Sequence, residues 1–167
     1  MRRLIAATFA LVASTGAAFA GSHTIDSCAD PFETDIAAIY WQINDKWADF
    51  QDFVEGYTGY SLSGCLETRL TDNGDARCID LPAGVAGRAW PGVQLISLDD
   101  GWLSDLEGRA STQKDRRACI AALMAHEHSH NCGASEGRAD NIGEAAHEWW
   151  QDVFGGSDSY LTCWLAD

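Results

Sequence analysis

Hydrophobic residues recur every three or four positions in three stretches of the chain, and this spacing predicts three amphipathic helices. The first is expected over residues 31–56, where a proline opens the helix and a glycine ends it. The second is expected over residues 111–131 and the third over residues 135–154. Residues 118–125 of the second helix are apolar on every side, so we expect this helix to be buried on several faces.

Two shorter patterns between the first two helices predict β-structure. Residues 64–81 contain the pair Asn73-Gly74, which is typical of the turn of a β-hairpin. Residues 93–98, VQLISL, form a short apolar strand. The order helix, hairpin, strand, helix, helix predicts a single domain of the α+β class.

The start of the chain, residues 1–20, has the pattern of a secretory signal peptide. Two arginines precede an apolar run, and the small residues Ala18 and Ala20 mark the expected cleavage site. The run is too short to form a stable membrane span, and no later segment approaches the necessary length. We therefore expect a mature single domain over residues 21–167 that is secreted or periplasmic.

Acidic residues outnumber basic residues by 25 to 11, which gives a formal net charge of −14. A charge of this sign disfavours nucleic acids and anionic membrane surfaces as partners. It is compatible with a cationic partner, and solubility outside the cell explains it equally well.

All six cysteines follow the signal peptide, and an even number in an exported chain of this size predicts three disulfides. Cys119 and Cys132 flank the second helix, which at about 1.5 Å per residue holds them about 20 Å apart, too far to pair. If the hairpin is closed by its own disulfide, the returning third helix favours Cys163 as the partner of Cys119. The predicted pairs are Cys65–Cys78, Cys119–Cys163 and Cys28–Cys132.

The second predicted helix ends in the sequence His126-Glu127-His128-Ser129-His130, which is an HExxH motif. His126 and His130 are four positions apart, so both imidazoles leave one face of the helix and can bind the same metal ion. Glu127 lies one position further round, close enough to hold a water molecule beside that ion. His128 and Ser129 point away from this face, and we expect them to pack or to form a cleft wall.

A catalytic zinc ion takes three protein ligands and leaves one position open for water. We expect Glu136, just beyond the predicted end of the helix, to be the third ligand. Glu144, His147 and Glu148 on the third helix are alternatives, although each is also typical of a solvated polar face. Asp140, one turn beyond Glu136, is placed to accept a hydrogen bond from a ligand imidazole and so fix its tautomer.

The longer pattern HExxHxxGxxE, from His126 to Glu136, resembles the zincin metallopeptidases. The segment Glu136 to Asp140 also resembles the ExxAD pattern of gluzincin-like peptidases, in which the glutamate is a metal ligand. Unlike metzincins, the chain has no methionine after the motif, since its methionines are Met1 and Met124. The resemblance covers residues 93–140.

This resemblance implies a small zincin-like domain in which residues 93–98 form an edge strand before the helix that carries the motif. It also implies one Zn²⁺ per chain, Glu127 as the general base, and a peptide or protein as the substrate. Three residues are equal candidates for stabilising the oxyanion of the reaction: Tyr160, Tyr57 and His147.

Two other functions are compatible with the sequence. The first is a non-catalytic zinc-binding or interaction protein, in which the ion ties two helices together. The second is a metal-free exported binding module. Three disulfides reduce the need for a structural ion in so small a domain. A zinc-dependent peptidase is therefore the function that the sequence favours.

Overall fold

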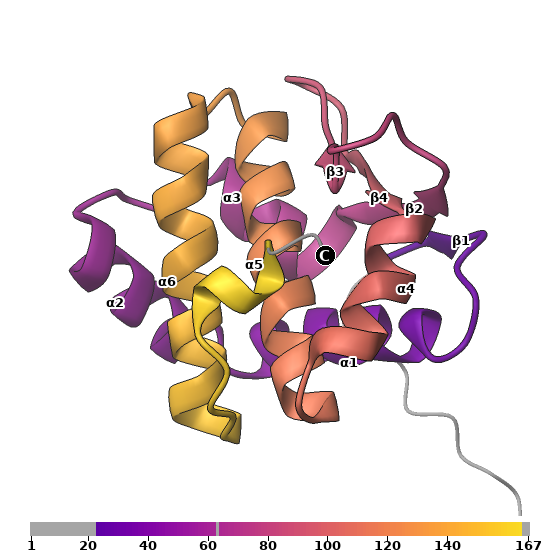
Figure 1. Ribbon diagram of the computed structural model, residues 1–167. Helices are drawn as coiled ribbons and strands as arrows, with labels where there is room; N and C mark the ends of the chain where they lie inside the picture. Colours follow the sequence, from indigo (N-terminus) through magenta and orange to yellow (C-terminus); the bar gives the residue numbers. More distant parts are fainter. Residues whose placement is uncertain (1–22, 63, 165–167) are drawn as a thin grey trace, which may run out of the picture.

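The helix that carries the histidine motif, α5 (Gln113–Asn131), runs through the middle of the domain, and α6 (Glu136–Phe154) lies beside it (Figure 1). The computed structural model describes residues 23–62 and 64–164, so the predicted signal peptide lies outside the described residues. All side chains from Ala118 to Ser129 are buried, as the apolar run within this segment predicts. The central position of α5 therefore follows from its sequence.

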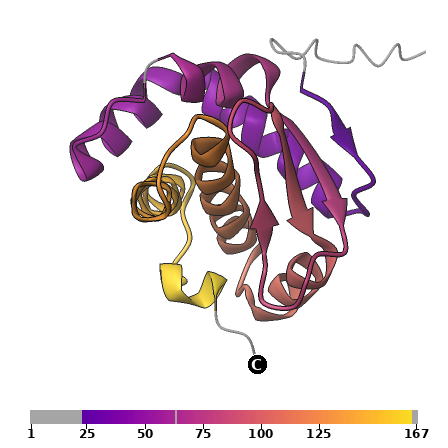
Figure 2. The ribbon, with the colours of Figure 1, turned by 90° about the horizontal axis from the view of Figure 1, so that it is seen from above.

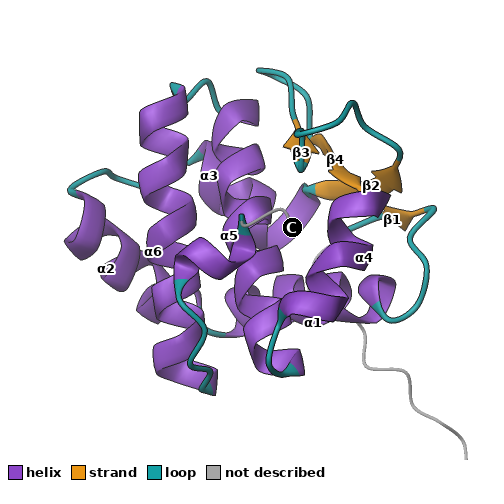
Figure 3. Ribbon diagram, viewed as in Figure 1, coloured by secondary structure: helices purple, strands orange, loops and turns teal. Residues whose placement is uncertain are grey.

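A small sheet covers the face of α5 opposite α6 (Figures 2 and 3). Its strands lie in the order β1 (Ile25–Asp26), β2 (Asp75–Ile79), β4 (Leu95–Asp99) and β3 (Gly87–Arg88). The first three run parallel, and β3 pairs antiparallel with β4. The predicted strand at residues 93–98 is thus present as β4, but it is an inner strand. The edge of the sheet beside β4 is β3, whose two residues are too few to give a sequence pattern.

The first predicted helix is wrong in its continuity, because residues 31–56 belong to two helices. These are α1 (Phe32–Asp45) and α2 (Trp47–Thr58), separated at Lys46, whose φ of −115° leaves the helical range. α1 packs against α5, whereas α2 packs along α6, where the ring of Phe50 meets the edge of Trp149. One straight helix could not follow both neighbours, so the tertiary contacts break it.

The predicted hairpin over residues 64–81 is also wrong. α3 (Cys65–Thr68) continues into a π-helical turn, η1 (Arg69–Asn73), and only then does β2 begin. Gly74 has φ −77°, which is not the positive value that a tight hairpin turn needs. A Cβ at Gly74 would clash with the carbonyl oxygen of Arg69 and lie 2.8 Å from Cε1 of His128, so this glycine allows close packing against both η1 and α5.

One predicted disulfide is confirmed and two are wrong. Cys119 pairs with Cys163, as the return of the last helix indicates. The disulfide expected to close the hairpin is not formed, because residues 64–81 form no hairpin: α3 lies at the end of α5, and β2 lies beside β1. Cys65–Cys78 and Cys28–Cys132 are therefore replaced by Cys65–Cys132 and Cys28–Cys78. As predicted from their separation along α5, Cys119 and Cys132 do not pair.

The ends of the two central helices agree with their sequences. Thr112 caps α5 by accepting a hydrogen bond from the backbone N–H of Asp115, and Gly133, with φ +82°, follows the last turn. A further helix, α4 (Asp100–Arg109), follows its capping residue Asp99 and was not predicted. In the part of the chain that the structure describes, no helix is long and apolar enough to cross a membrane.

Candidate metal centre

Three donor side chains meet where α5 ends and α6 begins. The Nε2 atoms of His126 and His130 lie 3.1 Å apart. The tight turn after α5 brings the first residue of α6 over this pair, so the carboxylate oxygens of Glu136 lie 3.6 Å from His126 Nε2 and 3.2 Å from His130 Nε2. Sequence spacing alone placed these residues together, and the structure brings all three to one point.

The distances among these donors fit a tetrahedral zinc ion. Ligand atoms at about 2.0–2.2 Å from zinc lie about 3.3–3.6 Å from one another in that geometry, and the separations here, 3.1, 3.2 and 3.6 Å, are within 0.2 Å of that range. Two imidazole nitrogens and a carboxylate oxygen are also a donor set that zinc accepts. The three residues therefore fit Zn²⁺ in both spacing and chemistry.

The other nitrogen of each ring is oriented by a neighbour. His126 Nδ1 lies 3.3 Å from Oδ1 of Asp140, and His130 Nδ1 lies 3.0 Å from the carbonyl oxygen of Ala134. With the proton on Nδ1, each ring turns the lone pair of Nε2 toward the centre. Burial and the neighbouring His130 lower the pKa of His126, which favours the neutral imidazole that binds metals.

Glu127 lies beside the three donors, but its carboxylate is not hydrogen-bonded within the described part of the chain. It is 5% exposed, and its burial, reinforced by the charge of Glu136, raises its pKa to about 7, against a lowering effect of Arg88. The edge strand passes close to it, since a Cβ at Gly87 would lie 2.5 Å from Oε1 of Glu127. The pKa of this carboxyl group is therefore close to neutral pH, and β3 leaves the side chain little room to move.

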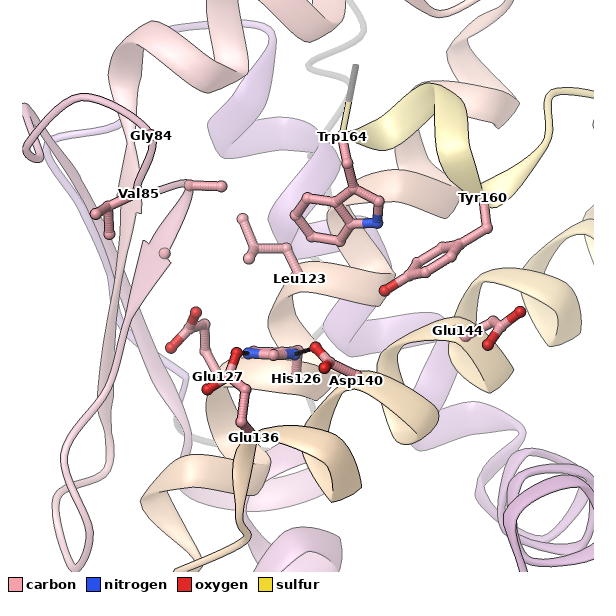
Figure 4. Close-up of a pocket in the computed structure, with 12 residues that line it drawn as sticks. Gly84, Val85, Leu123, His126, Glu127, Glu136, Asp140, Glu144, Tyr160 and Trp164 are labelled. Atoms are coloured by element: carbon pink, nitrogen blue, oxygen red, sulfur yellow. Dashed lines mark ion pairs between the residues drawn. The ribbon is translucent and has the colours of Figure 1, made fainter. Parts of the chain in front are cut away.

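These residues open into a cleft of about 560 Å³ (Figure 4). One wall is the chain before and within β3, the floor is α5, and the opposite wall combines α6 with the C-terminal 3₁₀ turn η2 (Tyr160–Cys163). Glu136, whose side chain is 74% exposed, stands at the mouth. The lining residues are Gly84, Val85, Ala86, Gly87, Leu123, His126, Glu127, Glu136, Asp140, Glu144, Tyr160 and Trp164.

The alternative third ligands do not join the three donors. Glu144 lines the cleft but does not belong to the cluster of donor atoms. His147 is fully buried further along α6, where its Nδ1 lies 3.3 Å from Oε1 of Glu148 and its ring packs against Tyr160. His147 lies near the sulfur atoms of Cys119 and Cys163, but these form a disulfide. Within the described residues, the geometry thus favours Glu136.

Of the three candidates for stabilising an oxyanion, Tyr160 is the one that lines the cleft. Figure 4 shows its hydroxyl directed into the hollow, above the floor formed by Leu123. Burial raises the pKa of Tyr160 to about 12, so the hydroxyl stays protonated as a hydrogen-bond donor. Tyr57 is half exposed and hydrogen-bonds to Glu144, and the cleft lining includes neither Tyr57 nor His147.

His128 packs on the far side of α5, as its place in the motif predicts. Its Nε2 lies 2.7 Å from the hydroxyl of Tyr40, and its Nδ1 lies 3.0 Å from Oδ1 of Asn131. Complete burial lowers the pKa of His128 to about 3, so the ring is neutral. Asn131 in turn donates to the carbonyl oxygen of Trp90, which ties α5 to the loop between β3 and β4.

Of the two outer walls of the cleft, β3 and the C-terminal turn, sequence reasoning named only Tyr160, as one of three equal candidates for stabilising an oxyanion. Gly87 lies in a glycine-rich segment whose composition indicates a loop, and Trp164 belongs to a C-terminal segment with no motif. The approach of Gly87 to Glu127 depends on the pairing of β3 with β4, which no local pattern encodes.

Comparisons with known proteins found no match: no model of a protein family, no curated protein and no solved structure matches this chain. The chemistry of the centre is therefore inferred from its own residues and their geometry.

Proposed function

We propose that this protein is an exported, zinc-dependent metallopeptidase of the zincin type. The observation that carries the proposal is the combination of three converging donors with the carboxylate of Glu127, which has no hydrogen-bond partner among the described residues, in the same cleft. Three disulfides support an oxidising compartment, because such bonds persist mainly in exported proteins. The substrate would be a peptide or protein that enters the open side of the cleft.

His126, His130 and Glu136 would hold the ion, and Asp140 would orient the ring of His126. When bound, zinc supplies Lewis acidity, which acidifies a water molecule and polarises a peptide carbonyl. Glu127 then accepts a proton from water in the cleft and delivers it to the leaving amine. The protonated hydroxyl of Tyr160 donates a hydrogen bond to the negative charge that develops on the substrate oxygen.

A non-catalytic zinc clip is the alternative, and one observation favours it: the ligands span the turn between α5 and α6, so an ion would join two helices. A clip has no use for the carboxylate of Glu127, however, whose burial disfavours its charged form and raises its pKa to about 7. It also has no use for a cleft of about 560 Å³ beside the ion. Both features are explained if the centre acts on a substrate.

Replacing Glu127 by glutamine separates the two functions. Under the peptidase proposal, the variant folds and binds one zinc ion per chain but loses hydrolysis of denatured protein by about 10²- to 10⁴-fold, the usual contribution of a general base. The matched control is Glu148→Gln, which removes an acid from α6 outside the cleft and should leave zinc content and activity unchanged. A folded, zinc-loaded wild-type protein that cuts no member of a broad peptide library would refute the enzyme and leave the clip.

A further inference from the structure

A second hollow adjoins the metal cleft at Trp164, and we call it the tryptophan pocket. It has a volume of about 300 Å³ and shares Gly84, Val85, Ala86 and Trp164 with the lining of the metal cleft. Its other lining residues are Ala83, Asp99, Gly101, Trp102, Asp105 and Arg109. The shared residues place the two hollows side by side, within reach of neighbouring side chains of one peptide.

The pocket offers mainly apolar surface. Trp102 and Trp164 place their ring centroids 5.8 Å apart, and the apolar Val85 lines both hollows. The indole N–H of Trp102 already donates to the carbonyl oxygen of Cys163, which leaves the ring faces to pack with a ligand. The Asp99 carboxylate is likewise occupied, because it accepts from the backbone N–H groups of Leu81 and Trp102.

The wall that carries Trp164 is held in place before any ligand arrives. The preceding residue, Cys163, is bonded to Cys119 in the middle of the domain. Further back in the same segment, the backbone N–H groups of Ser157 and Asp158 donate to the carboxylate of Asp115. A pocket whose walls are already ordered loses little conformational freedom when it binds, which favours affinity and selectivity.

We propose that the tryptophan pocket is a specificity subsite that takes a large apolar side chain, most favourably an aromatic one, of the peptide substrate. This inference rests on the proposed peptidase function and adds the class of residue that the enzyme selects next to the bond it cuts. An aromatic side chain matches the paired indole rings of Trp102 and Trp164. An acidic side chain is disfavoured, since two acids, Asp99 and Asp105, line the same pocket against one basic residue, Arg109.

The binding arm of the test does not depend on cleavage. N-acetylphenylalanine amide is titrated into the zinc-loaded protein while the indole N–H signals are followed by nuclear magnetic resonance. The signals of Trp102 and Trp164 should shift and saturate, and N-acetylaspartate amide should leave them unmoved. Trp41, exposed on α1 outside both hollows, is the internal control. If the phenylalanine probe leaves Trp102 and Trp164 unmoved, the subsite is refuted, whether or not the protein cuts peptides.

The cleavage arm measures selectivity directly. In a peptide library, phenylalanine should exceed alanine by at least about tenfold in kcat/KM at one fixed position from the cut, because hydrophobic pockets discriminate by about 10- to 200-fold even for one methylene. Trp164→Ala should remove this preference and leave those at other positions intact, while Trp41→Ala changes nothing.

A second variant covers the case in which Trp164→Ala does not fold. Val85→Asp adds an acid to the opposite wall of the pocket and should convert the preference for phenylalanine into a preference for basic or small residues. An unchanged preference in a folded variant would overturn the proposal. A protein that binds the phenylalanine probe but cuts nothing would instead refute the peptidase and keep the apolar pocket.

Discussion

Replacing Asp140 by alanine is expected to weaken zinc binding about tenfold while the protein stays folded. Asp140 touches the ligand ring and not the donor atoms, because its Oδ1 lies 3.3 Å from His126 Nδ1. Partners of this kind typically change metal affinity by about 10- to 100-fold. Two features place Asp140 at the low end of that range: its side chain is 56% exposed, and the backbone of Ala139 also hydrogen-bonds to His126. A tenfold loss corresponds to about 1.4 kcal/mol of binding free energy.

The measurement is a competition for zinc between the metal-free protein and a coloured chelator at neutral pH and fixed ionic strength. Asp140→Asn keeps an acceptor for the ring N–H and should lose less affinity than Asp140→Ala. Glu144→Ala removes the same charge from the next turn of α6 without touching His126, and it serves as the matched control. If Glu144→Ala weakens binding as much as Asp140→Ala, the effect is one of net charge and the orienting role is refuted. A loss far above 100-fold would make Asp140 a direct ligand.

Two further substitutions test the centre and the scaffold behind it. Glu136→Ala should reduce zinc affinity far more than Glu148→Ala in the same chelator assay, and the opposite ranking would move the third ligand further along α6. Asp35→Ala should lower the free energy of unfolding by about 3–5 kcal/mol, because Arg116 and Arg117 both pair with this fully buried carboxylate and lose it. The measurement is a denaturant titration with the disulfides intact. A loss below about 1 kcal/mol would show that both arginines find water instead.

The meeting of His126, His130 and Glu136 was predictable because the pattern that unites them is local. His126 and His130 share a helix face by their spacing, and Glu136 reaches them through a single tight turn that Gly133 marks in the sequence. Helix periodicity and capping act over a few residues, so the sequence alone identified the ends of α5 and the start of α6 closely. The same locality predicted that Asp140 would lie beside one of the two imidazoles, and in the structure this is the ring of His126.

The sheet and two of the disulfides were not predictable in this way, because they depend on contacts between distant segments. Gly74 follows an asparagine and so favours a hairpin locally, yet its lack of a side chain is used against His128, which lies more than fifty residues away. Because Cys65 begins α3 and not the expected strand, it lies at the end of α5, where its partner is Cys132. Non-local packing thus decided what the local pattern left ambiguous.

What favours an enzyme over a clip comes from the outer walls of the cleft, of which the sequence indicated only Tyr160. Two histidines and Glu136 on a helix–turn–helix are sufficient to hold an ion, and that much lies between residues 126 and 136. The fold adds β3 on one side, where Gly87 lets the backbone approach Glu127, and the C-terminal turn on the other, where Tyr160 faces the same hollow. The Cys119–Cys163 disulfide anchors that turn to α5, and a simple clip would need neither wall. Distant parts of the chain are thus held around an acid that has no hydrogen-bond partner among the described residues, an arrangement that serves a substrate and a water molecule better than it serves an ion alone.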